Sequence, residues 1–274
     1  GGRECSYASD ADVIALHEAV GGASDSEAAA SATAIVNRVK KLLGSATSQL
    51  GIVVDLDLRP EGKNGPMSRT IASHEEYAQR WASTWERQAA VRARPIGSSD
   101  LDERARALFE SMAYREVSES EVRDIRLLKA RMENERLPRG SEPARHVKLG
   151  PGGLSDVEWT IQLIQMRHGA RLPALRTPST TQAIAVARDA GLLAAPDAEI
   201  LLNAWDLATR IRAGNTLATG RMSGVKLDVV PRDSAELSAL AAILGYGSGG
   251  LTALEEDWLR AARQARNVME RAFW

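Results

Sequence analysis

Cysteine is almost absent from this chain of 274 residues, and aromatic residues make up only 4% of it. The one cysteine, Cys5, cannot form an internal disulfide, which argues against a secreted domain braced by disulfides and favours a reducing compartment. No apolar run approaches the roughly 20 residues that span a bilayer, and the opening Gly1-Gly2-Arg3-Glu4 is unlike a signal peptide. We therefore expect a cytoplasmic protein with no membrane segment.

The chain also lacks an excess of either charge. Lys and Arg number 35 against 36 Asp and Glu, a formal net charge of -1, so there is no basic footprint for nucleic acid or an anionic membrane. Hydrophobic residues make up 44% of the chain, which is enough for a substantial core. No initiator methionine precedes Gly1, and we expect the sequence to be an internal piece of a longer chain.

From about residue 98 onward the pattern predicts helices almost without a break. Apolar residues recur there at helical spacing, and Gly or Pro separates the segments. A Ser or Thr followed three residues later by Glu or Gln marks a helix start, because the two side chains cap the free backbone amides. This pattern occurs at Ser118, Ser155, Ser179 and Thr252, and Asp197 marks one more start. We predict an all-helical bundle.

The front of the chain differs, because residues 10–16 and 52–58 alternate with a period of two and predict strands. Between them Ser24 and Glu27 predict a capped helix whose apolar stripe is Ile35, Val39 and Leu42. This mixture of strands and helices predicts a catalytic α+β domain over residues 1–115, followed by the bundle over residues 116–274.

A second helix is predicted to start at Ser73, with Glu76 as its capping partner. Tyr77, Trp81 and Trp85 follow at intervals of four residues and so fall on one stripe. Helical spacing alone explains the three rings, so we interpret them as core residues and not as a ligand cage.

Acidic residues alternate along both predicted strands. Asp10 and Asp12 are two residues apart and project from one face, and Asp55 and Asp57 repeat the arrangement. Neighbouring acids repel unless a cation lies between them, and hard oxygen ligands favour Mg²⁺ or Mn²⁺. A pair of such ions is the usual device for in-line transfer from a polyphosphate. The alternative is that these acids face solvent at an exposed sheet surface.

Several motifs in the same order resemble those of a known family. Gly1-Gly2, followed by Asp10-Ala11-Asp12, is similar to the signature of the nucleotidyltransferase superfamily. More narrowly, the chain resembles the glutamine synthetase adenylyltransferase family over residues 54–63, 85–89, 92–94 and 148–159. The resemblance covers nearly the whole chain. It implies a polymerase-β-like nucleotidyltransferase fold with a mixed sheet, followed by the helical bundle.

The family is bifunctional, with one unit that removes AMP from glutamine synthetase by phosphorolysis and a second that adds AMP from ATP. Residues 129–140 and 263–271 resemble the adding unit. The resemblance therefore implies transfer of AMP from ATP to a tyrosine of glutamine synthetase, in the regulation of nitrogen metabolism. It names glutamine synthetase and a nitrogen-signal protein of the PII type as partners. The rival interpretations are the AMP-removing unit and a catalytically silent module that docks glutamine synthetase.

The resemblance also implies roles for the acids. Asp10 and Asp12 would hold two metal ions, Mg²⁺ or Mn²⁺. Asp55 would be the third carboxylate, which shares one metal and helps to deprotonate the attacking hydroxyl. Asp57 is a secondary candidate, because many relatives carry Arg at that position.

ATP would be bound by residues from the turns near these strands. The backbone amides of Gly1 and Gly2 would approach the phosphates, where a Cβ would collide, and Ser9 could add a hydroxyl donor. Arg59 and Lys63 could neutralise phosphate charge. Alternatively, Arg59 only anchors the end of its strand, and Lys63 is solvated in a turn.

A glycine loop in the second half is a further candidate for ATP. Lys148, Gly152 and Gly153 precede a predicted helix N-terminus, a place that can hold phosphate. Asp156 and Glu158 are secondary candidates. The alternative is that both acids only stabilise the start of the helix. Glu158 would cap it together with Ser155, and Asp156 would lie in the first turn, where a negative charge is favourable.

Overall fold

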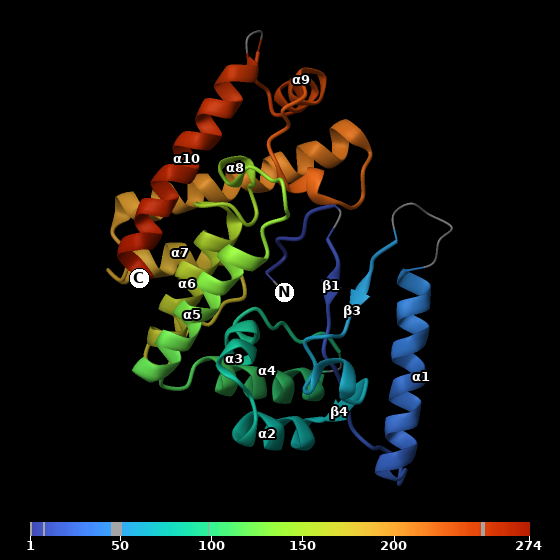
Figure 1. Cartoon of the computed structure of the whole chain (residues 1–274). Coiled ribbons are helices and arrows are strands. Elements are labelled where there is room, and N and C mark those ends of the chain that lie inside the picture. Colours follow the sequence, from blue (N-terminus) through green and yellow to red (C-terminus); the bar gives the residue numbers. More distant parts are fainter. Residues whose placement is uncertain (1, 8, 45–50, 98, 248–249) are drawn as a thin grey trace. The chain divides into compact units, whose positions relative to one another are not determined.

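The computed structural model describes residues 2–7, 9–44, 51–97, 99–247 and 250–274, and it is an α+β protein in which helices predominate (Figure 1). The chain divides into two units. One comprises Ser9–Arg115, and the other comprises Gly1–Ala8 together with Glu116–Trp274. Among the described residues, no helix combines the length and the apolar character that crossing a bilayer requires.

The first unit contains two small parallel sheets. β1 (Ala11–Asp12) pairs with β3 (Val54–Asp55), and β2 (Ala15–His17) pairs with β4 (Ser68–Thr70). The strands are shorter than the alternating patterns predicted, because residues 13–14 separate β1 from β2 and the chain turns directly after Asp55. The helices of this unit are α1 (Asp25–Leu43), α2 (Ile71–Arg80), α3 (Thr84–Ala90) and α4 (Ser99–Ala113).

Helix α1 begins where the sequence predicted, but its apolar stripe is not buried. Ser24 and Glu27 form the predicted capping box, and Gly44 is the C-cap. Ile35, Val39 and Leu42 are nevertheless exposed. The helix packs against β2 and β4, which are three residues each, too small a surface to cover a helix of 19 residues.

The predicted aromatic stripe is interrupted by the chain itself. Thr70, not Ser73, is the N-cap of α2, and its hydroxyl accepts a hydrogen bond from the Ser73 amide at 3.1 Å. The helix ends at Arg80, and a new capping box begins α3. Trp81 therefore lies between two helices and is 74% exposed, and Trp85 is exposed as well. The prediction that these two rings are core residues is wrong.

The second unit is the predicted helical bundle. Its helices are α5 (Glu119–Glu135), α6 (Leu154–His168), α7 (Thr180–Asp189), α8 (Ala195–Thr219), α9 (Ser234–Ile243) and α10 (Gly250–Ala272). α8 packs against its neighbours α6, α7, α9 and α10. The buried core is mostly aliphatic, with Trp205 of α8 buried and Trp258 of α10 completely enclosed. The starts predicted at Ser118 and Ser179 are confirmed by their capping hydrogen bonds.

Three helices of the bundle start before their predicted positions. α6 begins at Leu154 with Gly153 as its N-cap, so the predicted capping box of Ser155 and Glu158 is wrong. α8 begins at Ala195, with Pro196 in its first turn. α10 begins at Gly250, ahead of the predicted Thr252. Short 3₁₀ turns connect the helices at Pro143–Arg145, Pro173–Leu175 and Val225–Asp228.

Candidate functional site

The parallel pairing of β1 with β3 places two predicted site residues side by side. Asp12 is the register partner of Asp55, and the pair is flanked by backbone hydrogen bonds from Ala11 N to Val53 O at 2.8 Å and from Val13 N to Asp55 O at 2.7 Å. Partners in neighbouring parallel strands direct their side chains to the same face. The two carboxylates therefore share one face of this sheet, as the alternating pattern predicted.

The remaining acids lie just outside the two strands. Asp10 immediately precedes β1 and is exposed. Asp57 follows the end of β3, and its carboxylate lies 3.4 Å from Lys63 Nζ and 3.8 Å from Arg59 Nη1. Asp57 therefore does not continue the alternation of Asp55, because the strand predicted to reach residue 58 ends at residue 55. Within the described ranges, no three His, Cys, Asp or Glu side chains converge closely enough to hold a metal ion by themselves.

The loop that follows β3 fixes the orientation of Asp55. The backbone amide of Asp57 donates to Asp55 Oδ1 at 2.7 Å. Arg59 reaches back into the same loop, and its guanidinium donates to the carbonyls of Leu56, Lys63 and Gly65. These contacts agree with the alternative that Arg59 anchors the chain at the end of its strand. Lys63 is largely exposed.

A polar and aromatic cluster lies beside this loop, and no role for it is predicted from the sequence. Arg69 of β4 forms an ion pair with Glu61 at 3.0 Å, and its guanidinium lies over the ring of Tyr77. His74 of α2 is completely buried, with Phe109 edge-on at 5.4 Å between ring centres. Burial, reinforced by the nearby charge of Arg69, lowers the pKa of His74 from 6.5 to about 4. The cluster holds α2 to the loop and to α4, and residue type alone carries no signal for it.

The predicted phosphate-binding glycines at the start of the chain belong to the other unit. Gly1 lies outside the described residues. A Cβ added to Gly2 would lie 2.5 Å from the carbonyl oxygen of Pro178, so the small size of Gly2 is required by packing within this unit. The neighbouring Glu4 accepts a hydrogen bond from the Ser179 hydroxyl at 3.0 Å. Ser9 begins the first unit, directly before Asp10.

The glycine loop before α6 is folded tightly on itself. Gly152 has a φ of +74°, and a Cβ there would lie 1.8 Å from the carbonyl oxygen of Ala262 in α10. A Cβ on Gly153 would lie 2.6 Å from the carbonyl oxygen of Val147. The first amides of α6 are already engaged, because Leu154 N donates to Val147 O and Ser155 N donates to Lys148 O, each at 2.9 Å. The Lys148 side chain is exposed.

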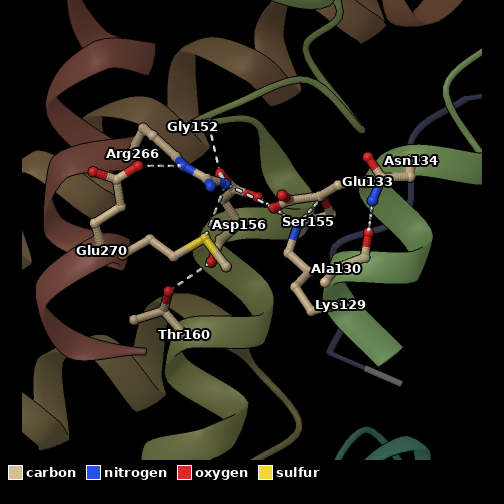
Figure 2. A network of polar contacts seen from close by, with 11 residues as sticks. Lys129, Ala130, Glu133, Asn134, Gly152, Ser155, Asp156, Thr160, Arg266 and Glu270 are labelled. Carbon is tan, nitrogen blue, oxygen red and sulfur yellow. Dashed lines mark hydrogen bonds and ion pairs between the residues drawn. The ribbon is translucent and has the colours of Figure 1, made fainter. Parts of the chain in front are cut away.

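Asp156 lies at the centre of a buried ionic network (Figure 2). Its Oδ1 lies 2.5 Å from Lys129 Nζ of α5, and its Oδ2 lies 3.1 Å from Arg266 Nη1 of α10. The amide of Gly152 also donates to Oδ2, at 2.7 Å. The side chains of Lys129 and Asp156 are each only 1% exposed. Asp156 therefore joins three helices and the glycine loop.

Glu133 completes the balance of charge in this network. Its Oε1 lies 3.1 Å from Lys129 Nζ and 2.7 Å from Arg266 Nη1. Burial opposes ionisation of Glu133, but hydrogen bonding to Arg266 and the charge of Lys129 outweigh it, and the pKa of Glu133 is lowered. Glu270 pairs with Arg266 at the rim, at 3.0 Å. Glu158 accepts a hydrogen bond from Gln162 Nε2 at 3.3 Å.

Two family models match the chain in succession. The glutamate-ammonia ligase adenylyltransferase model matches residues 1–110. A model described as GlnD PII-uridylyltransferase matches residues 126–273.

Curated relatives cover the whole chain. Bifunctional glutamine synthetase adenylyltransferase/adenylyl-removing enzymes are 45% identical in Streptomyces coelicolor and 46% identical in Streptomyces avermitilis, both over 277 residues. The enzyme of the same name from Leifsonia xyli is 44% identical over 276 residues. In each case the match takes in 100% of this chain but only 27% of the relative. The chain thus belongs to the family of bifunctional glutamine synthetase adenylyltransferase/adenylyl-removing enzymes.

Proposed function

We propose that this chain is a nucleotidyl-transfer unit that moves AMP from ATP to a tyrosine of glutamine synthetase in the cytoplasm. The observation that carries the proposal is the register pairing of Asp12 with Asp55, which puts two carboxylates on one face of a sheet in a chain of this family. The likeness of residues 129–140 and 263–271 to the AMP-adding unit supports this direction of reaction. A PII-type signal protein remains a predicted partner.

The acid pair fits a divalent ion of the hard, oxygen-preferring kind. Mg²⁺ is commonly bound through only one or two carboxylates, with substrate phosphates and waters completing its shell. Asp12 and Asp55, with Asp10 beside them in the chain, could therefore hold Mg²⁺ or Mn²⁺ together with ATP. When bound, such an ion would neutralise charge that builds on the phosphates during transfer.

The residues of the chain would then orient the reactants. In the proposed reaction the tyrosine oxygen bonds to the α-phosphorus, the bond from that phosphorus to pyrophosphate breaks, and Asp55 accepts the tyrosine proton. The exposed ammonium of Lys63, which lies 3.4 Å from the Asp57 carboxylate, can meet a phosphate, and the hydroxyl of Ser9, directly before Asp10, can donate a hydrogen bond. Alignment of the two reactants accounts for much of the rate in this class of transfer.

Labelled ATP tests both the reaction and its direction. With Mg²⁺ and ATP labelled at the α-phosphate, the protein should label unmodified glutamine synthetase. With phosphate and AMP-modified glutamine synthetase, it should form little ADP. Faster formation of ADP than incorporation of AMP would assign the chain to the AMP-removing reaction, and the absence of both would support a silent docking module.

The acids need a matched comparison. Asp12→Asn and Asp55→Asn should each lower the transfer rate by at least about a hundredfold, because each removes a charge from the metal-binding face. Asp25→Asn is the control, because Asp25 is an exposed acid in the first turn of α1. Full activity of either site variant at saturating Mg²⁺ would remove that residue from the proposed site.

A further inference from the structure

We infer that Arg59 is a positioning residue, which holds the loop after β3 so that Asp55 keeps one orientation. This inference rests on the proposed function, because Asp55 matters only if the acid face is the site of transfer. Arg59 does so by bonding to the backbone of its own loop, without touching ATP.

The guanidinium of Arg59 bonds to the loop at three points. Its Nη1 donates to Leu56 O at 2.8 Å, its Nε to Gly65 O at 3.1 Å, and its Nη2 to Lys63 O at 3.2 Å. The guanidinium places its N–H groups on three nitrogens of a planar fork, whereas the three donors of a lysine radiate from one nitrogen and cannot reproduce that spacing. The Arg59 side chain is only 11% exposed, so little of the fork is open to a phosphate in solution.

The loop held by Arg59 touches Asp55 directly. The amide of Asp57 donates to Asp55 Oδ1 at 2.7 Å. Leu56, whose carbonyl accepts from Arg59, lies between these two residues and is itself buried. A shift of this loop therefore moves the amide that orients the Asp55 carboxylate.

Close packing between Gly65 and Pro60 also constrains the conformation of this loop. A Cβ added to Gly65 would lie 2.0 Å from the carbonyl oxygen of Pro60, so only glycine fits where the loop folds back. The carbonyl of the same Gly65 accepts the Arg59 Nε bond. Gly65→Ala should consequently displace the loop without changing any charge, which separates loop geometry from the charge of Arg59.

The test compares four variants of the whole chain. Arg59→Lys keeps the charge and loses the fork, and Gly65→Ala disturbs the loop alone. Lys63→Ala removes an exposed charge of the loop but none of the three bonds from Arg59. Arg80→Lys is the matched control, because Arg80 is exposed at the end of α2 and forms an ion pair with Glu76 of its own helix.

Three quantities are measured. They are hydrogen exchange over residues 54–67, kcat and KM for ATP, and binding of Mn²⁺ in the presence of a non-hydrolysable ATP analogue. We expect Arg59→Lys and Gly65→Ala to raise exchange about tenfold, since each loosens backbone hydrogen bonds of the loop. Both should lower kcat by up to about a hundredfold and leave KM within about twofold, because misplacement of a catalytic group affects chemistry more than substrate binding. Mn²⁺ binding should weaken in both, whereas Arg80→Lys should match the wild type in all three.

Different results would overturn the inference. Unchanged exchange in Arg59→Lys would show that Arg59 does not hold the loop. Raised exchange with unchanged kcat and Mn²⁺ binding would show that the loop does not position Asp55. A rise in KM with unchanged kcat, shared by Arg59→Lys and Lys63→Ala, would make Arg59 a phosphate ligand. If the wild type itself transfers no AMP, the proposed function fails, while exchange and Mn²⁺ binding still decide the role of Arg59.

Discussion

Asp156→Asn removes one charge from the centre of the buried network and preserves the shape of the side chain. Among the described residues, Lys129 would keep Glu133, at 3.1 Å, as its ionic partner, and Arg266 would keep Glu133 and the rim residue Glu270. Breaking a buried ion pair by neutralising one member costs about 3–5 kcal/mol, because the other charge stays buried without full compensation. The Lys129 side chain is 1% exposed and cannot recover its hydration. We therefore expect the free energy of unfolding of the helical unit to decrease by about 3–5 kcal/mol.

The double variant Lys129→Met/Asp156→Asn isolates the reason for this loss. Met fills most of the volume of the lysine stem and leaves no ammonium to desolvate, so the double variant should be more stable than Asp156→Asn alone. Glu270→Gln is the control, because Glu270 lies at the exposed rim and its pair with Arg266 is worth at most about 1 kcal/mol. The coupling energy between Lys129 and Asp156 is obtained by comparing the wild type, Lys129→Met, Asp156→Asn and the double variant in a double-mutant cycle.

Urea unfolding should be followed by hydrogen exchange in α6 and α10, since the chain has two units and a single fluorescence transition would mix them. A loss below about 1 kcal/mol for Asp156→Asn would mean that the network is hydrated or unimportant. A double variant no more stable than Asp156→Asn would show that the uncompensated charge of Lys129 is not the cause.

Four further outcomes are expected. Burial lowers the pKa of His74 to about 4. In the unfolded chain this histidine is protonated below about pH 6.5, whereas in the folded chain it stays neutral down to about pH 4. Stability should therefore fall across that window by up to about 3 kcal/mol, and His74→Phe should flatten the fall in urea titrations made from pH 7 to pH 4. Gly152→Ala should destabilise the bundle by several kcal/mol, roughly the sum of backbone strain and overpacking, whereas Gly191→Ala, with positive φ but open space around it, should cost only about 1–2 kcal/mol in the same assay. Asp12→Asn should leave the melting temperature of the metal-free protein unchanged or slightly higher, because it relieves repulsion beside Asp55. Arg59→Lys should lower kcat and spare KM, as the kinetics proposed above would measure.

Local signals in the sequence located several helices correctly. At Ser24 and Ser118 the capping boxes form as predicted, because each serine side chain accepts a hydrogen bond from the amide three residues further on. At Ser155 the same pattern fails, because the amides of Leu154 and Ser155 donate to the carbonyls of Val147 and Lys148, and the Ser155 amide is the one that the Glu158 side chain would accept in a capping box. The failure is tertiary in origin, since the glycine loop places those carbonyls at the helix start.

The aromatic stripe failed for a related reason. Tyr77, Trp81 and Trp85 have the right spacing for one helix, but Ser83 and Glu86 form a second capping box inside the stripe. A helix start is itself a local signal, and here it outweighs the periodicity of the rings. The apolar face of α1 shows the converse limit, because periodicity predicts a face and cannot say how much surface the rest of the unit has to cover it.

The two sites show what a sequence pattern leaves undecided. The acids could be predicted to share a face, because the period of a strand places Asp12 and Asp55 and parallel pairing makes them neighbours. The ionic network could not be predicted, because Arg266 meets Asp156 across 110 residues of sequence. Gly152 stands between these cases. A glycine allows either a phosphate or a backbone carbonyl to approach closely, because it has no Cβ. The loop pattern is therefore consistent with both. Within this unit the group that faces Gly152 is the backbone carbonyl of Ala262, and this carbonyl accounts for the glycine at position 152.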